Sequence, residues 1–428
     1  MISIMNMKLR NIPFSPPDMT EKEVALVREA ILSGWITTGP KTKQLEKEIS
    51  EFVHTEKTVC LNSATAAMEM VLHLLGVGPG DEVIVPAYTY TATASVACHI
   101  GAKVVMVDSQ KDNVEMDYDK LSDAITEKTK VIVPVDLGGI VANYERVFEI
   151  VEQKKALFRP NNALQAKIGR IIVSADCAHS FGGKRKGKMA GEIADFSSFS
   201  FHAVKNFTTA EGGAMTWKLP FGNEVVPTNV DYMTTVPKKE GETWNELLYR
   251  LSQLFSLHGQ NKDALAKTKL GAWEYDIIGP WYKCNMTDIM AALGLVQMER
   301  YKGILERRYH IVERYNEAVK GLPVAIMNHR DADHCSSHHL YLARLLGRTR
   351  EEANKVIEQM AERGIACNVH YKPLPMMTAY RALGFDIKDY PNAYNLFVNE
   401  VSLPLHTKLS DEDVEYVITN FVDIIKNS

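Results

Sequence analysis

The stretch SFHAVKNFTTAEGG, Ser200–Gly213, contains one lysine, Lys205, between two aromatic residues, with a histidine before it and a pair of glycines after it. It is too apolar for a solvated loop and too polar for a plain core strand. A lysine withdrawn from water is costly unless it is paired or neutral. A desolvated amine with a lowered pKa can attack carbonyls and form a Schiff base. The alternative, more frequent for a lysine chosen at random, is a packed stem whose ammonium reaches water.

Short apolar, β-branched segments alternate with helical patterns along the first two thirds of the chain. The pattern predicts strands at KTVCLN, DEVIVP, AKVVMVD, KVIVPVD, RIIVSAD and DFSSFSF. SATAAMEMVLHLLG and TEKEVALVREAILSG predict helices, the second with a capping box made by Thr20 and Glu23. The alternation predicts an α/β fold whose mostly parallel sheet is buried on both faces.

The pattern changes at about Asn285. TDIMAALGLVQMERYKGILERRYHIVERYNEAVKGL predicts one long helical stretch with at most one break, and shorter strands and helices follow it. We therefore expect a large domain over residues 1–284 and a smaller α+β domain over 285–428, which includes the long connecting helix. Residues 154–170 and 217–257 read as elaborations of this plan. We find no internal repeat and no low-complexity tract.

Composition narrows the class of protein. The 428 residues carry 49 Lys+Arg and 53 Asp+Glu, a net charge of −4, so nothing indicates nucleic acid or an anionic membrane as a bulk partner. The six cysteines are scattered without a C-x-x-C pair, which is typical of reduced thiols in a cytoplasm. We expect no signal peptide and no membrane span, hence a cytoplasmic protein.

Two polar side chains end the strand RIIVSAD. Asp176 closes it and His179 follows three positions later. Lys205 comes one strand further along the chain, so Asp176 and Lys205 are expected on the same rim of the sheet. A carboxylate beside a pyridine nitrogen would favour the protonated ring. Alternatively, the aspartate is a helix cap or a ligand of bound water, and the histidine is a satisfied core residue.

NSATAAMEM opens a predicted helix, and a helix N-terminus suits a phosphate. Ala64 and Thr65 would donate backbone N–H groups, with the Ser200 hydroxyl near the lysine as a further donor. Tyr90 follows a strand break, where an aromatic ring could stack on a flat ligand, although each of these features is more often structural. Together they match the needs of pyridoxal 5′-phosphate: a lysine, a carboxylate, a phosphate cup and a stacking partner.

With these features, the chain resembles the DegT/DnrJ/EryC1/StrS family of sugar aminotransferases. The resemblance rests on WITTGPKTKQLEKEI, LNSATAAMEMVLHLLGVGPGDEVIVPAYTYTATAS, ADCAHSFGG, SFHAVKNFTTAEGG, CNMTDIMAALGLVQMER and VSLPLHTKLSDED, which span most of the chain in the family order. It implies the aspartate aminotransferase-like fold: a mixed, mostly parallel seven-stranded sheet with a smaller C-terminal α+β domain. NSATA and SFHAVKN are most similar to the branch that makes UDP-4-amino-4-deoxy-L-arabinose.

The resemblance implies a role for each residue. Lys205 would hold the cofactor as a Schiff base and relay the proton, and Asp176 would bind the pyridinium nitrogen. His179 would lie near the ring's phenolic oxygen or its face. The remaining cofactor contacts would be stacking by Tyr90 and phosphate binding by Ala64, Thr65 and Ser200.

Other implied roles reach beyond one subunit. Asn285 corresponds to a family asparagine that reaches the phosphate of the neighbouring subunit, which implies a homodimer with composite active sites. Thr38 and His370 would lie near a nucleotide-sugar, and glutamate would be the amino donor, leaving 2-oxoglutarate. The implied reaction is ping-pong amination of a 4-keto nucleotide-linked sugar in surface polysaccharide or amino-sugar biosynthesis.

Several alternatives stay open. Amination at C3 is separated from C4 only by the branch resemblance. A sugar 3-dehydrase of the family has histidine where this chain has Lys205, which argues against dehydration. A regulator that kept the fold without the chemistry is disfavoured by Lys205 and Asp176. Departures from the family pattern are the long 214–257 segment, VHYKPLPMMTAY and Cys177.

A metal site is the last alternative. DHCSSHHLY holds His334, Cys335, His338 and His339, a density of ligands that resembles a zinc site. HHLYLARL also resembles the family's strand opening the small domain, where histidines occur without metal. We therefore predict no metal.

Overall fold

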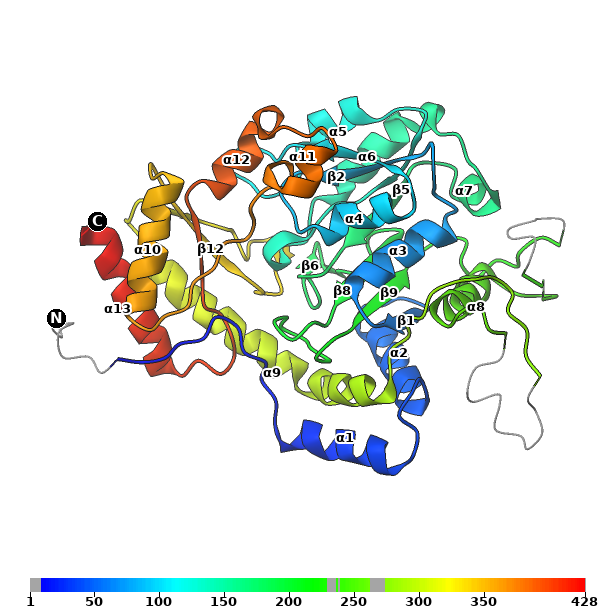
Figure 1. The fold of residues 1–428 in the computed structure, drawn as a ribbon, viewed down its shortest axis with the longest axis horizontal. Helices are drawn as coiled ribbons and strands as arrows, with labels where there is room; N and C mark the ends of the chain where they lie inside the picture. The colour runs from blue at the N-terminus through cyan, green and yellow to red at the C-terminus, as the bar shows by residue number, and fades with distance from the viewer. Residues whose placement is uncertain (1–8, 229–235, 238, 262–273, 428) are drawn as a thin grey trace.

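A seven-stranded sheet forms the centre of the molecule (Figure 1). The computed structural model describes residues 9–228, 236–237, 239–261 and 274–427. The strand order is β1-β9-β8-β5-β4-β2-β3, and pairs from β3 through β8 are parallel, whereas β9 runs antiparallel to β1 and β8. The strands are β1 (Thr58–Leu61), β2 (Glu82–Pro86), β3 (Lys103–Val107), β4 (Thr129–Ile132), β5 (Ile172–Asp176), β8 (Phe196–Ser200) and β9 (Gly213–Trp217). The predicted mixed, mostly parallel sheet of seven strands is confirmed.

Helices cover this sheet. α3 packs against β5, β8 and β9, and α4 packs against β2 and β3. The capping box predicted from Thr20 and Glu23 is present at the start of α1. The helices of this part are α1 (Glu21–Leu32), α2 (Pro40–Phe52), α3 (Ala64–Leu74), α4 (Ala92–His99), α5 (Tyr118–Ala124), α6 (Tyr144–Gln153), α7 (Ala163–Ile168) and α8 (Trp244–Ser256), with 3₁₀ turns at Leu137–Gly139 and Lys155–Leu157.

The long helix α9 (Asp288–Ala318) is continuous over 31 residues, so the break that the sequence left room for is absent from it. Gly294 lies inside the helix and does not interrupt it. A Cβ there would stand 2.7 Å from the Leu45 Cδ2 atom of α2, so the glycine permits close packing of the two helices. In Figure 1, α9 runs along the molecule from α2 toward α13 (Asp411–Asn427).

Beyond α9, a smaller antiparallel sheet has the order β10-β12-β13, with helices α10 and α13 packed against each other beside it. Its elements are β10 (Val324–Ile326), β12 (Tyr341–Leu345), β13 (Glu400–Leu403) and α10 (Arg350–Glu362). A third sheet, β11 (His334–Cys335), β6 (Lys184–Arg185) and β7 (Lys188–Met189), joins the two parts. The last elements are α11 (Thr378–Ala382), α12 (Pro391–Phe397) and 3₁₀ turns at Leu374–Met376 and Ile387–Asp389.

Two hydrophobic clusters form the core. One fills the seven-stranded sheet and its helices and reaches Tyr380 and Leu396, late in the chain. The other lies around the small sheet and includes Ile12, near the N-terminus. The division at residue 285 stays a prediction. No helix among the described residues is long and apolar enough to cross a membrane.

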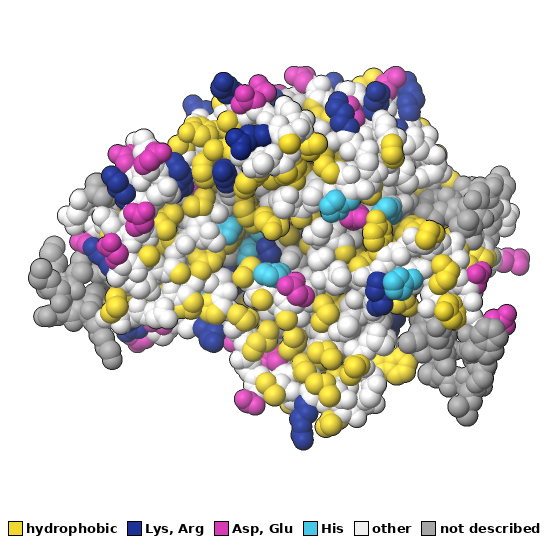
Figure 2. Space-filling model, in the orientation of Figure 1, with side chains coloured by type: hydrophobic (Ala, Val, Ile, Leu, Met, Phe, Trp, Pro, Cys, Tyr) yellow, Lys and Arg dark blue, Asp and Glu magenta, His cyan; other side chains and the backbone are white. Residues whose placement is uncertain are grey.

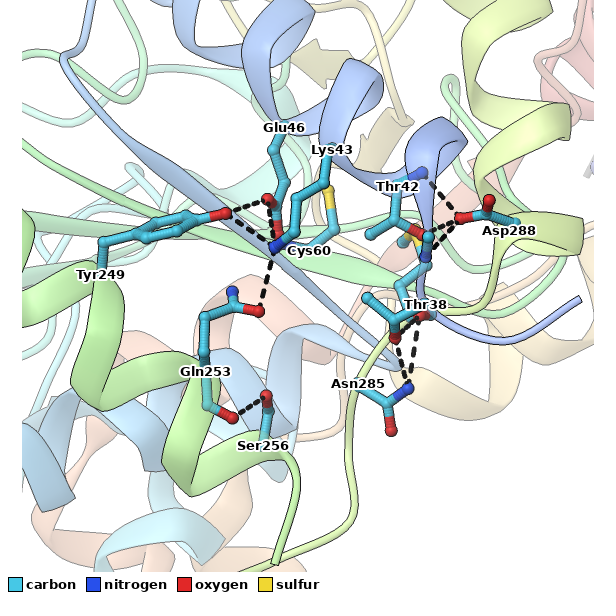
Figure 3. Close-up of polar contacts among 12 residues, drawn as sticks. Thr38, Thr42, Lys43, Glu46, Cys60, Tyr249, Gln253, Ser256, Asn285 and Asp288 are labelled. Atoms are coloured by element: carbon cyan, nitrogen blue, oxygen red, sulfur yellow. Dashed lines mark hydrogen bonds and ion pairs between the residues drawn. The ribbon is translucent and has the colours of Figure 1, made fainter. Parts of the chain in front are cut away.

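The 217–257 elaboration carries α8, although residues 229–235 and 238 of it lie outside the described residues. α8 packs on α3 and β1, and the Trp217 indole N–H donates to Asn245 at 2.8 Å. Figure 3 shows Tyr249 of α8 donating to the buried Glu46 carboxylate at 2.6 Å, while the Lys43 ammonium contacts both. A polar network therefore ties this elaboration to α2.

One buried carboxylate joins α2 to α9. The Asp288 side chain accepts hydrogen bonds from the backbone N–H groups of Gly39, Lys41 and Thr42 at 2.8, 3.1 and 2.9 Å (Figure 3). It also accepts from the Thr42 hydroxyl at 2.7 Å. A residue at the N-terminus of α9 thus caps α2, a helix whose own N-cap is Gly39 and offers no side chain.

Replacing Asp288 by alanine is expected to lower the free energy of unfolding by about 2 to 3 kcal/mol, because buried N–H groups lose a charged acceptor. Urea unfolding at fixed protein concentration measures the change. The exposed Asp123, replaced in the same way, is the matched control and should stay within about 0.5 kcal/mol of the parent. Equal effects of the two substitutions would contradict the capping role.

Candidate active site

A cavity of about 360 Å³ lies where the carboxyl ends of the parallel strands meet the N-terminus of α3. Figure 2 shows histidine side chains gathered around a hollow on this face of the molecule. Eight of the predicted site residues line the cavity: Ala64, Thr65, Tyr90, Asp176, His179, Ser200, Lys205 and His370. Residues far apart in the sequence therefore meet in one place, as the sequence predicted for the strand ends.

The N-terminus of α3 faces this cavity. Ser63 caps the helix by accepting from the Ala66 N–H at 3.0 Å, and within the described residues the backbone N–H groups of Ala64 and Thr65 have no protein acceptor. A Cβ at Gly213 would stand 2.3 Å from the Ser63 carbonyl carbon, so only glycine lets the start of β9 approach the helix this closely. The free N–H groups and the positive helix end suit an anion.

Lys205 lies in the turn between β8 and β9. Its backbone N–H donates to the His202 carbonyl at 2.9 Å, and the neighbouring Asn206 amide donates to the Ser337 carbonyl at 3.1 Å. Phe201 and Phe207, the two aromatics around the lysine, pack with their ring centroids 4.6 Å apart. Both belong to the buried core. This anchoring turns the lysine amine into the cavity.

Asp176 ends β5, beside β8 in the sheet, and is 4% exposed. The Thr93 hydroxyl donates to its Oδ2 atom at 2.7 Å, and the Ala178 N–H donates to Oδ1 at 3.1 Å. Burial raises the pKa of Asp176, while these two donors and the charge of Lys205 counteract the rise. The aspartate is therefore a supported acceptor in the cavity wall, not a helix cap.

The amine and the carboxylate act on each other. Burial lowers the pKa of Lys205 to about 8, and the nearby charge of Asp176 limits the fall. Part of the Lys205 side chain remains open to the cavity, so its amine is desolvated yet reachable. A lysine in this condition is a substantial fraction neutral near physiological pH, which is what attack on a carbonyl carbon requires.

His179 contacts a tyrosine that the sequence analysis did not select. Its Nδ1 atom accepts from the Gly138 N–H at 3.1 Å, so the neutral ring carries its proton on Nε2. That nitrogen lies 3.1 Å from the Tyr371 hydroxyl oxygen and donates to it. Burial lowers the pKa of His179 well below its ordinary value. His179 thus orients Tyr371, and Tyr371 keeps its own proton to donate elsewhere.

Two further histidines of the cavity are also neutral. Burial first, and the positive charge of Lys205 second, lower the pKa of His370 to about 3. Burial likewise lowers the pKa of His339 well below its ordinary value, and its ring centroid lies 4.6 Å from that of His179. The cavity therefore places neutral hydrogen-bonding rings around a single amine.

Tyr90 contributes an aromatic face at the cavity. It is 59% exposed, and its ring centroid lies 5.8 Å from that of Tyr371. A large aromatic side chain with this exposure, beside a cavity, is available to stack on a flat ligand. Its reading as an ordinary core residue does not fit this exposure.

Thr38 and Asn285, by contrast, do not line the cavity. They contact each other: the Asn285 amide donates to the Thr38 hydroxyl at 2.5 Å, and that hydroxyl donates to the Met286 carbonyl at 2.6 Å (Figure 3). Lys283 donates to the Asn285 side-chain oxygen. Within one subunit, the structure therefore does not place Thr38 or Asn285 at the cavity where a ligand would bind.

The histidine-rich stretch divides among different surroundings. His339 lines the cavity, whereas the His334 ring contacts the Asn328 carbonyl at 2.7 Å and Asp331 at 3.0 Å. The His338 ring packs against His329 and Tyr309. Within the described residues no three His, Cys, Asp or Glu side chains are arranged to hold a metal ion.

Sequence reasoning missed Thr93 and Tyr371 of this site, and it considered His339 only as a possible metal ligand. Thr93 lies in the quoted YTYTATAS, and Tyr371 directly follows His370. Position next to a selected residue was the available signal for Tyr371. Nothing local marks Thr93 as the donor to Asp176, 83 residues away.

The donor set fits pyridoxal 5′-phosphate. Free N–H groups at a helix N-terminus, with the Thr65 and Ser200 hydroxyls nearby, provide for a phosphate. A buried carboxylate provides for a ring nitrogen, a reachable lysine for an aldehyde, and an exposed tyrosine ring for a flat face. One cavity holds all four.

Comparison with known proteins agrees with a site for pyridoxal 5′-phosphate. The model of the DegT/DnrJ/EryC1/StrS aminotransferase family matches residues 17–422. "Spore coat polysaccharide biosynthesis protein SpsC" of Bacillus subtilis is 34% identical over 423 residues, 97% of this chain and 98% of that protein.

Solved structures extend the comparison. "Putative sugar aminotransferase Spr1654 from Streptococcus pneumoniae, PMP-form" is 55% identical, with a TM-score of 0.89 and coverage of 97% of this chain and 99% of that one. The PLP-form of the same protein is 53% identical over the same shares, with a TM-score of 0.88. Helicobacter pylori PseC, at 24% identity and a TM-score of 0.81 over 98% and 100%, shares the fold.

The lowered pKa of Lys205 predicts unusual reactivity. In protein freed of carbonyl compounds, trace acylation followed by peptide mass spectrometry should show Lys205 gaining reactivity through a pH near 8 instead of 10.5, because the neutral amine is the reacting form. Replacing Asp176 by asparagine should move this inflection to lower pH, since the charge that favours the ammonium is removed. An unshifted inflection in the parent protein would refute the buried amine.

Proposed function

The chain belongs to the DegT/DnrJ/EryC1/StrS aminotransferase family and is a pyridoxal 5′-phosphate-dependent sugar aminotransferase, and on that premise we propose that it transfers the amino group of glutamate to a 4-keto nucleotide-linked sugar. The observation that carries the proposal is the cavity that joins a reachable lysine of lowered pKa to a buried carboxylate. The name of the Bacillus subtilis relative supports a role in surface polysaccharide biosynthesis. The UDP-4-amino-4-deoxy-L-arabinose branch and a cytoplasmic location stay predictions.

Pyridoxal 5′-phosphate supplies an aldehyde that amines attack and a protonated ring that withdraws electrons from the reacting carbon. Lys205 Nζ is the amine that holds the cofactor between turnovers. With the cofactor bound, the neutral Nζ atom would accept the proton from the donor's Cα and later donate that proton, so that none is gained or lost overall. Its lowered pKa suits both tasks near neutral pH.

Asp176 keeps the ring nitrogen protonated because its carboxylate is fixed by Thr93 and Ala178. Ala64, Thr65 and Ser200 bind the phosphate, and Tyr90 covers a face of the ring. His179 donates to the Tyr371 hydroxyl, which leaves the Tyr371 proton to be donated into the same cavity. His370 is placed to meet the sugar.

We further propose that Asn285 and Thr38 serve the cavity of a second subunit. Their side chains are bonded to each other outside the cavity of their own chain. Exposed apolar side chains lie near them in the sequence, Ile36 two positions before Thr38 and Tyr282 three positions before Asn285. Exposed apolar side chains of this kind support a protein interface. The site is then complete only in a homodimer.

Replacing Lys205 by alanine should abolish covalent attachment of the cofactor, so that borohydride reduction no longer labels the protein and its absorbance band is lost. We expect kcat for amino transfer to fall by about 10²- to 10⁴-fold, since the proton relay is also removed. Release of 2-oxoglutarate from glutamate and NMR of the aminated sugar measure the two half-reactions. The exposed Lys188, replaced by alanine, should change neither. Retained labelling in the Lys205 variant would rule the proposal out.

The composite site predicts complementation. The Lys205→Ala and Asn285→Ala variants, unfolded together and refolded, should form mixed dimers in which one of the two sites has both native residues. Activity should then rise above that of either variant alone, to about a quarter of the parent's for random pairing. Activity equal to the mean of the two variants would show that Asn285 serves its own subunit.

A further inference from the structure

A chain of hydrogen bonds leads from the cavity into the protein through His370. The His370 Nδ1 atom lies 2.8 Å from the Ser402 Oγ atom, and the Ser402 hydroxyl lies 2.5 Å from the Glu400 Oε1 atom. The other carboxyl oxygen of Glu400 accepts the His370 backbone N–H at 2.9 Å. Glu400 and Ser402 are fully buried on β13. Neither was selected from the sequence, and neither lines the cofactor cavity.

Glu400 also borders a second cavity, of about 430 Å³, which is lined by Tyr88, Arg185 and Arg344 among others but not by His370. Tyr88 connects this cavity to His370, because its hydroxyl donates to the His370 carbonyl at 2.7 Å. The charged or titratable groups that act on this chain are Tyr88, His179, Lys205, His339, Arg344, Arg350, Cys367 and Tyr371.

When Glu400 is ionised, its two oxygens can only accept hydrogen bonds. The Ser402 hydroxyl must then donate to Glu400, and its oxygen accepts the proton of His370 Nδ1. The neutral ring of His370 therefore has a lone pair on Nε2. Within the described residues Nε2 has no hydrogen-bond partner, and His370 lines the cavity. His370 Nε2 thus presents a hydrogen-bond acceptor to the cavity.

When Glu400 is protonated, the same atoms reverse direction. The carboxyl O–H donates to Ser402 Oγ, and the Ser402 hydroxyl donates to His370 Nδ1, which must then be without a proton. The ring proton of His370 is then on Nε2, and this N–H group presents a hydrogen-bond donor to the cavity. Burial raises the pKa of Glu400 to about 8, although Ser402 and the His370 N–H favour the ionised form.

We propose that Glu400, acting through the Ser402 hydroxyl, sets which ring nitrogen of His370 carries the proton and thereby whether His370 accepts from or donates to the substrate. Glu400 is a positioning residue in this scheme. The ionised form suits a sugar hydroxyl, whose proton needs an acceptor. This last step rests on the proposed amination of a sugar, whereas the tautomer of His370 does not.

The Glu400→Gln variant tests the tautomer without any substrate. Its amide oxygen keeps the His370 N–H bonded, and its NH₂ group donates to Ser402, as the protonated acid would. In ¹⁵N-histidine NMR of the cofactor-loaded protein, with the His370 signal assigned from a His370→Asn variant, the parent should shift from protonated Nε2 to protonated Nδ1 as pH rises through about 8. Glu400→Gln should keep protonated Nε2 at every pH. The same tautomer in both proteins at alkaline pH would overturn the proposal.

Val401→Ala is the matched control, because Val401 is fully buried on β13 and its side chain points to the other face of the strand. It should lower stability and leave the His370 tautomer and its pH response unchanged. Loss of the pH response in Val401→Ala would show that the tautomer merely reports the integrity of the strand, and this would also overturn the proposal.

Kinetics test the contact with the sugar. Above the transition, Glu400→Gln should raise the KM for the keto sugar roughly three- to tenfold, with the glutamate half-reaction unchanged. The inflection that the parent shows when kcat/KM for the sugar is plotted against pH should be absent from the Glu400→Gln variant. An unchanged KM and profile would overturn the sugar contact. A parent enzyme that aminates no keto sugar would instead refute the proposed function, with the NMR result unaffected.

Discussion

The site depends on burying an amine and a carboxylate in one cavity wall. Desolvation disfavours the charged form of each, and each shifts the pKa of the other back toward the ionised form. The fold makes this arrangement possible because β5 and β8 are parallel neighbours in register, Asp176 opposite Ser198. A lysine in the turn after β8 then comes to the rim where β5 ends. This juxtaposition provides the amine and the carboxylate that suit the cofactor. The close approach at Gly213 places the N-terminus of α3 beside them.

Sequence reasoning reached most of the fold and the part of the site carried by local signals. Apolar strands alternating with helical patterns predicted six strands of the sheet, whereas the seventh, β9, entered only through the strand count that the resemblance implies. Strand ends were sufficient to expect Asp176 and Lys205 on one rim. Tertiary approach was not predictable. Tyr371 meets His179 across 192 residues, and the Asp288 carboxylate reaches Gly39 across 249. The close approach of Leu45 to Gly294, which brings α2 against α9, had no local signal either.

Thr38 and Asn285 were predicted from the family resemblance, because no local sequence pattern marks either residue as part of a site. Within the described residues of one subunit their side chains bond to each other. Asp288 fixes the backbone at Gly39, beside Thr38, and Asn285 precedes the same helix by a few residues. The segment that carries both residues is therefore held in place by the N-terminus of α9.

The uninterrupted α9 has a consequence for how the two sheets are held relative to each other. Its first half packs in the core of the seven-stranded sheet through Ala291 and Leu295, and its second half packs in the small-sheet core through Ile311 and Tyr315. Because one continuous helix belongs to both cores, bending it between them would disturb helix hydrogen bonds and two packed interiors. The position of the small sheet relative to the seven-stranded sheet is therefore coupled to the packing of both cores.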